Sequence, residues 1–286
     1  MANTPAIPIR SALLVSDIHL NQDQPQLAQA FFTWLDQHTL SAAQPPQAVF
    51  ILGDLVDAWV GDDQLANQPS SSVDAQLCRQ LRAIKQAGIT TYFLHGNRDF
   101  LIGAEFAAAT GIRLLSDPTQ IEIQTENRKS QTHQKDHSAS HGFIAKRPGE
   151  ALRIVLSHGD QLCTQDSAYQ AFRKQVRDPQ WQAAFLAKPL AERLQIAQHL
   201  RAQSEIEKSG KAMEIMDITQ AEADRLVAHS HADTLIHGHT HRPGRYPLQD
   251  SKDRWVLPDW DTDTSGRLTR GGGLYLGEQG IRPVTI

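Results

Sequence analysis

Residues 48–57 read AVFILGDLVD, an apolar run that stops at a glycine and two aspartates. A short apolar run rich in β-branched and aromatic residues is typical of a buried strand. Glycine permits the tight turn that exposes a side chain where such a strand ends. The pattern recurs, because apolar runs at 12–16, 91–94, 153–157 and 233–236 also stop at polar residues that are potential metal ligands. We therefore predict five buried strands whose ends carry the chemistry.

Helical patterns lie between the first of these strands. Apolar residues recur at helical spacing across 26–38 and 73–87, and Gly88 stands where a left-handed residue would end the second helix. Strands that alternate with helices predict an α/β fold, a layered core with helices packed outside the sheet. Further strand patterns at 120–125, 254–257 and 273–276 indicate that the sheet is extended or is joined by a second one.

Composition excludes several classes of protein. With 286 residues, of which 40% are hydrophobic and 21% charged, the chain is neither collagen-like, wholly disordered nor a polytopic membrane protein. The N-terminal sequence lacks the apolar stretch of a signal peptide, so we expect a soluble, cytosolic protein. The net charge of −4 argues against a general nucleic-acid binder. Two cysteines are too few for a disulfide framework or a cysteine metal site, so any metal must have N and O ligands.

The strand ends carry candidate ligands that are carboxylates, imidazoles and one amide. In an open α/β sheet the crevice beyond the carboxyl ends of the strands is the usual ligand site, so all five clusters can converge there. Such groups suit Mn²⁺, Mg²⁺, Fe²⁺ or Zn²⁺. They are too many for one ion, and we predict a two-metal site that shares a carboxylate, with the ions ~3.5 to 4 Å apart. The candidates are Asp17, His19, Asp54, Asn97, His158, His239 and His241. We interpret Asp57, Asp99 and Asp160 as caps, turn formers or acceptors that orient ligating histidines.

In order, these motifs are D-x-H, G-D-x-x-D, G-N-x-D, H and G-H-x-H. The pattern resembles that of the calcineurin-like metallophosphoesterase superfamily, which implies a layered sheet core with flanking helices. The resemblance also implies that Asp17, His19 and His241 hold one ion and that Asp54 bridges. The second ion would then be held by Asn97, His158 and His239.

A narrower resemblance rests on longer stretches, at residues 52–63, 92–103, 158–164, 169–173 and 235–243. From about residue 10 to 260 the chain is similar to the UDP-2,3-diacylglucosamine pyrophosphatase family of lipid A biosynthesis. Most superfamily members carry His after the Gly-Asn pair, whereas Arg98 stands there in this chain. In that narrower family a helical insert caps a chamber for acyl chains, and this chain contains a similar insert.

The resemblance implies an activity and its cofactor. The expected reaction is hydrolysis of UDP-2,3-diacylglucosamine to UMP and 2,3-diacylglucosamine 1-phosphate by metal-activated water that attacks the uridine-side phosphorus, with two Mn²⁺ ions. Asp54, Arg98 and His239 are the expected catalytic residues. The expected substrate contacts are Asn97, Arg98, Asp166, Tyr169, Ser204, Lys211 and His239. Lys208 departs from the family, which more often has a small polar residue there, and it receives no role.

The insert, residues 166–211, is predicted to be helical, with apolar residues among eight Lys/Arg and five Asp/Glu. This composition fits a cap that binds an anionic partner with apolar chains, or equally an ordinary packed pair of helices. We expect a peripheral protein on the cytoplasmic face of the inner membrane, with an anionic membrane surface as partner and neither nucleic acid nor an obligatory protein partner. The apolar side chains expected to line the acyl chamber are Phe172, Val176, Phe185, Leu186, Leu190 and Leu194.

Residues 126–149 are polar and show no apolar period, so we predict a mobile loop within a single domain that spans 1–286. His133, His137 and His141 are spaced by four, but a solvated loop is favoured over a third metal site. Two other functions stay open. One is a dinuclear hydrolase of water-soluble nucleotides, and the other is a non-catalytic scaffold, which would usually have lost ligands.

Overall fold

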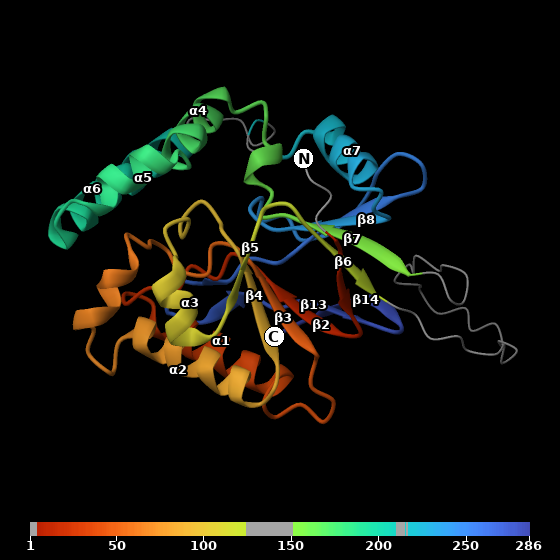
Figure 1. Cartoon of the computed structure of the whole chain (residues 1–286), viewed down its shortest axis with the longest axis horizontal. Helices are drawn as coiled ribbons and strands as arrows, with labels where there is room; N and C mark the ends of the chain where they lie inside the picture. Colours follow the sequence, from red (N-terminus) through yellow and green to blue (C-terminus); the bar gives the residue numbers. More distant parts are fainter. Residues whose placement is uncertain (1–4, 124–150, 210–214, 216) are drawn as a thin grey trace, which may run out of the picture.

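The computed structural model describes residues 5–123, 151–209, 215 and 217–286. Two six-stranded sheets lie face to face, with helices on the outside of each (Figure 1). Of the two arrangements that the sequence left open, the second sheet is the one observed. The predicted loop at 126–149 and the predicted substrate contact Lys211 lie outside the described residues.

The first sheet has the order β14-β13-β2-β3-β4-β5. Its members are β2 (Ala12–Val15), β3 (Ala48–Leu52), β4 (Thr90–Leu94), β5 (Arg113–Leu115), β13 (Gly273–Gly277) and β14 (Gly280–Val284). Strands β2 to β5 pair in parallel, whereas β13 is antiparallel to both β2 and β14. Every residue of β2 and β3 is buried, which explains why both read as continuous apolar runs.

The second sheet has the order β1-β6-β7-β8-β10-β9. Its members are β1 (Ile7–Ile9), β6 (Thr119–Ile123), β7 (Leu152–Leu156), β8 (Thr234–His237), β9 (Gly244–Pro247) and β10 (Asp253–Val256). Strands β7, β8 and β10 are parallel to one another. The five strands that carry the chemistry are therefore divided between two sheets, three in the first and two in the second, so the crevice of a single sheet does not describe the site.

Helices cover the outer faces of the sandwich. On the first sheet lie α1 (Pro25–His38), α2 (Val73–Gln86) and α3 (Ala104–Thr110), and on the second lies α7 (Gln220–His229) (Figure 1). Leu27, Phe31 and Leu35 of α1 are buried in one core cluster with side chains of β2 and β3. A second cluster fills the space between the sheets, and a third lies beneath α7. Gly88 has a φ of 84°, the left-handed conformation that was predicted after α2.

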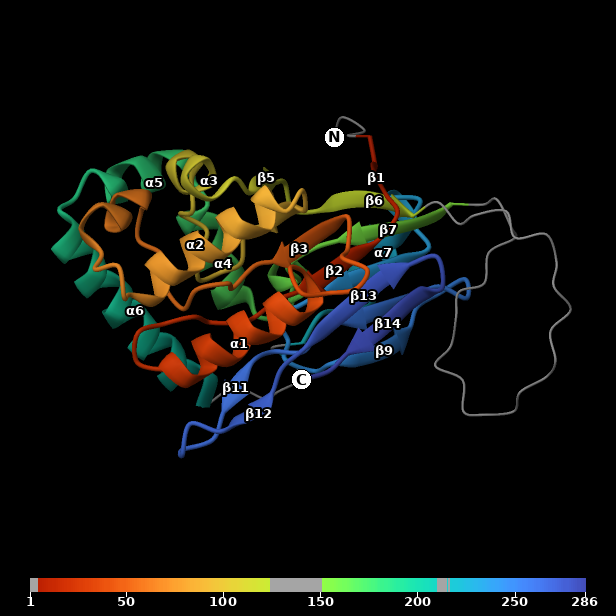
Figure 2. The ribbon, with the colours of Figure 1, turned by 90° about the horizontal axis from the view of Figure 1, so that it is seen from below.

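Three helices form the insert: α4 (Ser167–Val176), α5 (Pro179–Leu186) and α6 (Leu190–Ser209). The side chains of Asp166 and Asp178 cap the N-termini of α4 and α5. The insert extends along one end of the sandwich, away from α7 (Figures 1 and 2). Two short 3₁₀ helices, η1 (Asp62–Asn67) and η2 (Asp160–Leu162), and a small hairpin, β11 (Asp261–Thr262) with β12 (Leu268–Arg270), complete the described elements. None of the described helices is long and apolar enough to span a membrane.

Candidate metal centre

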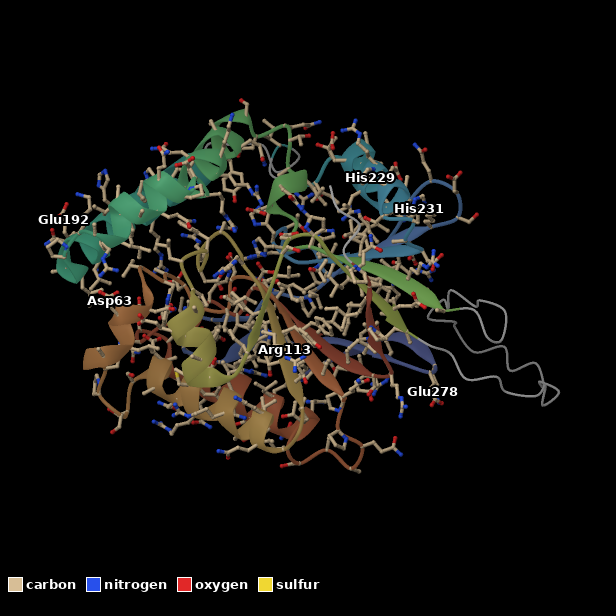
Figure 3. All side chains as sticks on the ribbon, viewed as in Figure 1. Asp63, Arg113, Glu192, His229, His231 and Glu278 are labelled. Atoms are coloured by element: carbon tan, nitrogen blue, oxygen red, sulfur yellow. The ribbon has the colours of Figure 1, made fainter. Side chains whose placement is uncertain are left out.

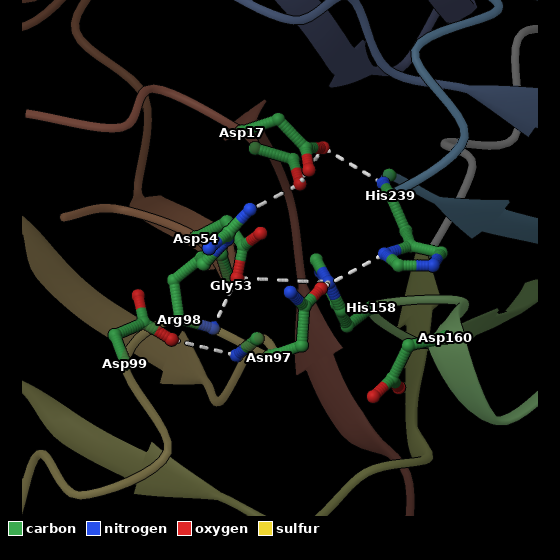
Figure 4. A network of polar contacts seen from close by, with 12 residues as sticks. Asp17, Gly53, Asp54, Asn97, Arg98, Asp99, His158, Asp160 and His239 are labelled. Atoms are coloured by element: carbon green, nitrogen blue, oxygen red, sulfur yellow. Dashed lines mark hydrogen bonds and ion pairs between the residues drawn. The ribbon is translucent and has the colours of Figure 1, made fainter. Parts of the chain in front are cut away.

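The ends of five strands bring the predicted ligands together between the two sheets (Figure 4). Asp17 follows β2, Asp54 follows β3 and Asn97 follows β4, all in the first sheet. From the second sheet, His158 follows β7 and His239 follows β8. Main-chain hydrogen bonds hold the turns in place: the Asp17 N–H donates to the Gly53 carbonyl at 3.1 Å. The Gly238 N–H donates to the His158 carbonyl at 3.0 Å. All seven predicted ligands therefore lie in these strand-end turns, because His19 and His241 follow two residues behind Asp17 and His239.

Backbone strain is concentrated at these residues. A positive φ is uncommon for a residue with a side chain and costs free energy, so it persists only where the surroundings enforce it, often at functional sites. The candidate ligands with a positive φ are Asp17 (54°), His19 (55°), Asp54 (52°), His239 (67°) and His241 (54°). The sequence pattern predicted turns at the strand ends, but it did not reveal this left-handed conformation of the candidate ligands.

One half of the centre consists of an amide oxygen and two imidazoles. Asn97 Oδ1 lies 3.0 Å from His158 Nε2 and 2.9 Å from His239 Nδ1. Ligand atoms about 3.0 Å apart are what an octahedral ion with bonds of about 2.1 Å requires of neighbouring positions. The other nitrogen of His158, Nδ1, lies 2.8 Å from the Leu52 carbonyl. Because a carbonyl can only accept, Nδ1 carries the hydrogen, and Nε2 is the nitrogen available to a metal.

In the other half, Asp17, His19 and His241 form a group whose potential ligand atoms lie within 4.8 Å of one another. His241 Nε2 lies 3.5 Å from Asp17 Oδ1. Asp54 lies between the two halves, because its Oδ2 is 3.9 Å from His19 Nε2 and its Oδ1 is 3.8 Å from His158 Nε2. One carboxylate oxygen thus faces each half, which is the arrangement a bridging ligand needs.

The donor atoms fit a pair of divalent cations. Asp17 Oδ1 and His19 Nδ1 are buried and have no hydrogen-bond partner within the described part of the chain. Buried polar atoms are normally satisfied, so a buried carboxylate oxygen that faces histidines without a hydrogen bond fits a position that binds a cation. The set contains oxygen and nitrogen only, which suits hard and borderline divalent ions. Cys78 and Cys163 are buried in the hydrophobic clusters instead.

Charge and burial also set the protonation of the histidines. Burial is the main cause that lowers the pKa of His239, to about 4, so its imidazole is neutral at pH 7 and has a lone pair for a metal. Burial also opposes the charged form of His158, but the carboxylates of Asp54, Asp17 and Asp160 outweigh it and raise the pKa to about 9. In the absence of an ion, a proton therefore takes the place of a cation between His158 and these carboxylates.

Arg98 and Asp99 follow Asn97 in the same turn. The Arg98 backbone N–H donates to Asp54 Oδ1 at 2.9 Å, and the Arg98 side chain is half-buried at the site (Figure 4). Asp99 is buried, and its carboxylate accepts the Gly96 and Leu55 N–H groups at 2.7 Å each. It joins the turns that follow β3 and β4, in agreement with the predicted turn-forming role.

The insert contacts these turns through charged side chains. Asp160, which follows His158 by two residues, accepts hydrogen bonds from the Tyr169 hydroxyl and from Arg173 Nε at 2.8 Å each. Arg177 donates to the Gly96 carbonyl at 2.8 Å. Tyr169 and Arg173 lie on one face of α4, and Arg177, the C-cap residue, continues the same spacing of four. Farther along, Arg201 pairs with Asp57.

Arg193 makes the most buried of these contacts. Its side chain is 2% exposed and donates to the Val60 and Lys188 carbonyls and to the Asp63 carboxylate. Asp63 lies beside the far end of the insert, close to Glu192 (Figure 3). The four arginines at 173, 177, 193 and 201 thus contact the rest of the molecule. These contacts are those of packed helices, one of the two alternatives that the composition of the insert left open.

Apart from the metal ligands, five side chains were predicted to contact the substrate, and the structure describes three of them: Arg98, Asp166 and Tyr169. Asp166 Oδ1 accepts the Tyr169 backbone N–H at 3.0 Å and caps α4. The Tyr169 ring lies 5.8 Å from the His239 ring, so it borders the metal centre. Arg98 lies in the site as described above. The side chains of Ser204 and Lys208, like Lys211, lie outside what is described.

The apolar side chains of the insert divide into two groups. Val176 and Phe185 are buried, and Leu190 packs against the first core cluster. Leu186 and Leu194 are 42% and 43% exposed. The insert is therefore partly packed against the core and also carries two leucines that are largely exposed.

The sequence analysis missed Asp259, which lies 3.3 Å from His241 Nδ1. A signal existed, because Asp259 follows β10 just as the predicted ligands follow their strands. The run at 254–257 was predicted as a strand, and Asp259 stands two residues beyond it.

Comparisons with known proteins agree with this geometry. The family model described as calcineurin-like phosphoesterase matches residues 11–243. A UDP-2,3-diacylglucosamine hydrolase of Chromobacterium violaceum is 43% identical over 275 residues, which cover 95% of this chain and 97% of that protein. The protein of that name from Aromatoleum aromaticum is 41% identical over 266 residues, or 92% of this chain and 94% of that protein. The Bordetella pertussis protein of the same name is 40% identical over 274 residues, 94% of this chain and 92% of that protein.

Proposed function

This chain belongs to the calcineurin-like phosphoesterase family, and from this premise we propose that it hydrolyses the pyrophosphate bond of UDP-2,3-diacylglucosamine. The products would be UMP and 2,3-diacylglucosamine 1-phosphate, in a step of lipid A biosynthesis. The observation that carries the proposal is the Asp54 carboxylate, which faces His19 with one oxygen and His158 with the other. Relatives named for this hydrolase activity support the choice of substrate.

The predicted ligands would be distributed over two metal ions. Asp17, His19 and His241 would hold one ion, Asn97, His158 and His239 the other, with Asp54 between them. The chemistry that two divalent cations supply when bound is Lewis-acid charge at the phosphoryl oxygens and a pKa of coordinated water lowered from 15.7 to about 7. We propose Mn²⁺ for both, as the family resemblance implies; ligands without thiolate suit Mn²⁺ and other hard to borderline ions.

Arg98 is the residue that we assign to the reacting phosphoryl group. Its backbone N–H donates a hydrogen bond to Asp54 Oδ1, which places the Cα of Arg98 next to the bridging carboxylate. The guanidinium group binds two phosphate oxygens at once and offsets the charge that develops on them. His239, neutral at pH 7, would contact the same phosphate from the side of the second sheet, next to the Tyr169 ring.

Identification of products tests the proposed reaction. Metal-depleted protein is incubated with UDP-2,3-diacylglucosamine, with and without added Mn²⁺, in water enriched in ¹⁸O. We expect UMP and 2,3-diacylglucosamine 1-phosphate only when Mn²⁺ is present, with the label in UMP, because attack occurs on the uridine-side phosphorus. UDP-N-acetylglucosamine serves as the soluble comparison. Equal turnover of the two substrates would contradict the lipid assignment and favour a hydrolase of soluble nucleotides.

We also propose that the protein acts at the cytoplasmic face of the inner membrane, as a peripheral protein. The substrate's acyl chains favour a membrane, since each buried methylene contributes about 0.8 kcal/mol. Leu186 and Leu194 support this proposal because they expose large apolar side chains on the insert.

Vesicle flotation at low and high salt tests the membrane proposal. We expect binding to anionic vesicles that weakens as salt rises, and a Leu194→Asp variant that binds at least several-fold more weakly. Leu40→Asp is the matched control, because Leu40 is exposed to a similar degree (39%) but lies after α1, outside the insert. No binding of the unchanged protein at low salt would contradict the proposal.

A further inference from the structure

His241 differs from the other imidazoles of the centre because it is open to solvent. Its side chain is 40% exposed, compared with 0% for His158. The ring of His158 is held by burial and by the Leu52 carbonyl. An exposed ring has more rotational freedom, so it presents a fixed nitrogen to a metal only if another group holds it.

Asp259 is placed to hold the His241 ring. Asp259 Oδ2 lies 3.3 Å from His241 Nδ1, while His241 Nε2 lies 3.5 Å from Asp17 Oδ1. The two nitrogens therefore face opposite ways, one toward Asp259 and one toward the centre. A carboxylate that accepts the Nδ1 hydrogen leaves the lone pair on Nε2 and fixes the direction of the ring.

Asp259 is itself firmly positioned. Its carboxylate is 2% exposed and forms a two-point contact with Arg270, whose Nε lies 3.2 Å from Oδ1 and whose Nη2 lies 2.7 Å from Oδ2. Arg270 is the last residue of β12 and also contacts Asp261 of β11, at 2.9 Å. The hairpin thus supplies the counter-charge that keeps a buried carboxylate in one orientation.

The backbone next to Asp259 is tied to a ligand of the same half of the centre. The Trp260 N–H donates to the Asp17 carbonyl at 3.0 Å. The Trp260 ring packs edge-on against Phe31 and Trp34 of α1, and its Nε1 donates to the Gly272 carbonyl at 3.2 Å. Asp259 therefore cannot shift without disturbing the turn that contains Asp17.

From these contacts we propose that Asp259, held by Arg270, is a positioning residue for His241 and sets the affinity of one cation site, that of Asp17, His19 and His241. The inference rests on the proposed function, since it takes these three residues to be metal ligands. Groups that orient a ligating histidine commonly change metal affinity 10- to 100-fold when removed. The Asn97, His158 and His239 site has its own orienting group, the Leu52 carbonyl, and is joined to the first site through Asp54 and the Asp17 carboxylate, so we expect a smaller effect of Asp259 there.

The test is a titration of metal-free protein with Mn²⁺, followed by the electron paramagnetic resonance signal of free Mn²⁺, which requires no turnover. We expect two equivalents to bind to the unchanged protein. In Asp259→Asn one class of site should weaken by about 10- to 100-fold while the other stays within twofold. Asp261→Asn is the matched control, because it removes the same charge and a contact of the same arginine but does not contact His241. Its two affinities should equal those of the unchanged protein.

The outcomes separate the two claims. If the unchanged protein binds no Mn²⁺, the proposed metal centre fails. If it binds two and Asp259→Asn binds both as tightly, the role of Asp259 is overturned and the proposed function stands. Circular dichroism melting of each metal-free variant checks the fold. Should Asp259→Asn not fold, Arg270→Gln decides: a selective loss at one site supports the proposal, and unchanged affinities at both overturn it.

Discussion

Asp54 combines two properties that the sequence reveals to different degrees. The G-D-x-x-D motif at a strand end identified it as a ligand candidate, and the structure brings it between two groups of ligands. Its φ of 52° was not predictable from the motif, because the left-handed conformation depends on how the turn packs against Gly96 and the neighbouring sheet. The identities of the candidate ligands thus follow from local patterns, whereas their mutual geometry follows from long-range packing.

The conformation of Asp54 decides which substitution tests it. We expect Asp54→Asn to lose at least 100-fold in turnover, because the amide lacks the charge and the second anionic oxygen that a bridge between cations needs. Asn tolerates a positive φ, so the fold should be kept. Asp54→Ala adds a strain of about 1–2 kcal/mol and confounds the result. Rates of UMP release and melting curves provide the measurement, and an Asn variant with normal turnover would exclude the bridging role.

Arg98 offers a test of charge stabilisation that leaves the metal ligands in place. Replacement by Ala removes the guanidinium but keeps the backbone N–H that donates to Asp54. We expect kcat to fall by about 10² to 10³, the usual effect of removing one group that stabilises developing charge. Arg98→Lys should recover only part of the rate, since an ammonium group cannot bind two oxygens in a fixed plane. An Ala variant as fast as the unchanged enzyme would refute the assignment.

The helices of the insert illustrate what a charge pattern leaves undetermined. The sequence showed the excess of positive charge in the insert, and its pattern correctly predicted that residues 167–209 are helical. The charge pattern did not show whether the arginine side chains face the core or the solvent, because a helix with arginines on several faces can pack in more than one orientation. Asp57, Asp63 and Asp160 decide the direction, since each carboxylate is paired with an arginine of the insert, and those of Asp57 and Asp160 are buried. Partners that are far apart in sequence cannot be read from either segment alone.

We expect substitution of Arg193 to loosen the packing of the insert against the rest of the molecule. Arg193→Ala removes the contacts with Val60, Lys188 and Asp63, and we predict a KM for the acylated substrate about tenfold higher, with Mn²⁺ affinity unchanged. The ion pair between Arg193 and Asp63 contributes less to stability than a fully buried pair would, because the Asp63 side chain is exposed to solvent. Limited proteolysis should cut the variant within the insert sooner. Glu192→Gln is the control, because its pair with Lys188 is exposed and worth at most about 0.5 kcal/mol.

Comparison with Glu192→Gln also shows which result would contradict the role of Arg193. If Arg193→Ala and Glu192→Gln show the same KM and the same proteolytic pattern, the contact with Asp63 does not hold the insert. Gly61 provides an independent check, because an added Cβ there would come within 2.3 Å of the Arg193 guanidinium and the position has a φ of 136°. Gly61→Ala should therefore resemble Arg193→Ala rather than Glu192→Gln.

The division of strands between two sheets could not be read from the apolar runs, because such runs indicate burial but not pairing partners. Strands β2, β3 and β8 are buried throughout, while β4 has one half-buried residue and β7 one exposed residue. The edge strands β1 and β9 were not predicted, because they are short and partly exposed. The alternation of strands and helices predicted a layered core but left open whether the strands form one sheet or two.

Because the centre lies between the sheets, metal removal should lower the stability of the whole fold. An ion present at 100 times its Kd stabilises the native state by about 2.7 kcal/mol. A chain of this size changes its Tm by roughly 2–4 °C for each kcal/mol, so we expect a decrease of about 5–10 °C per ion removed by a chelator. The metal-free protein should still unfold cooperatively, since the apolar cluster between the sheets contains none of the ligands. Equal melting temperatures with and without Mn²⁺ would contradict a shared centre.

The antiparallel pairing of β2 with β13 has a consequence for how the protein is made. Ala12–Val15 leaves the ribosome well before its neighbour Gly273–Gly277 is synthesised. The hydrogen bond between the Trp260 N–H and the Asp17 carbonyl also forms only after residue 260 has been made. The first sheet is thus incomplete on one side while the residues between β2 and β13 are translated. A nascent chain stalled before residue 260 would expose an apolar strand edge, so we expect chaperones to protect it until β13 is made.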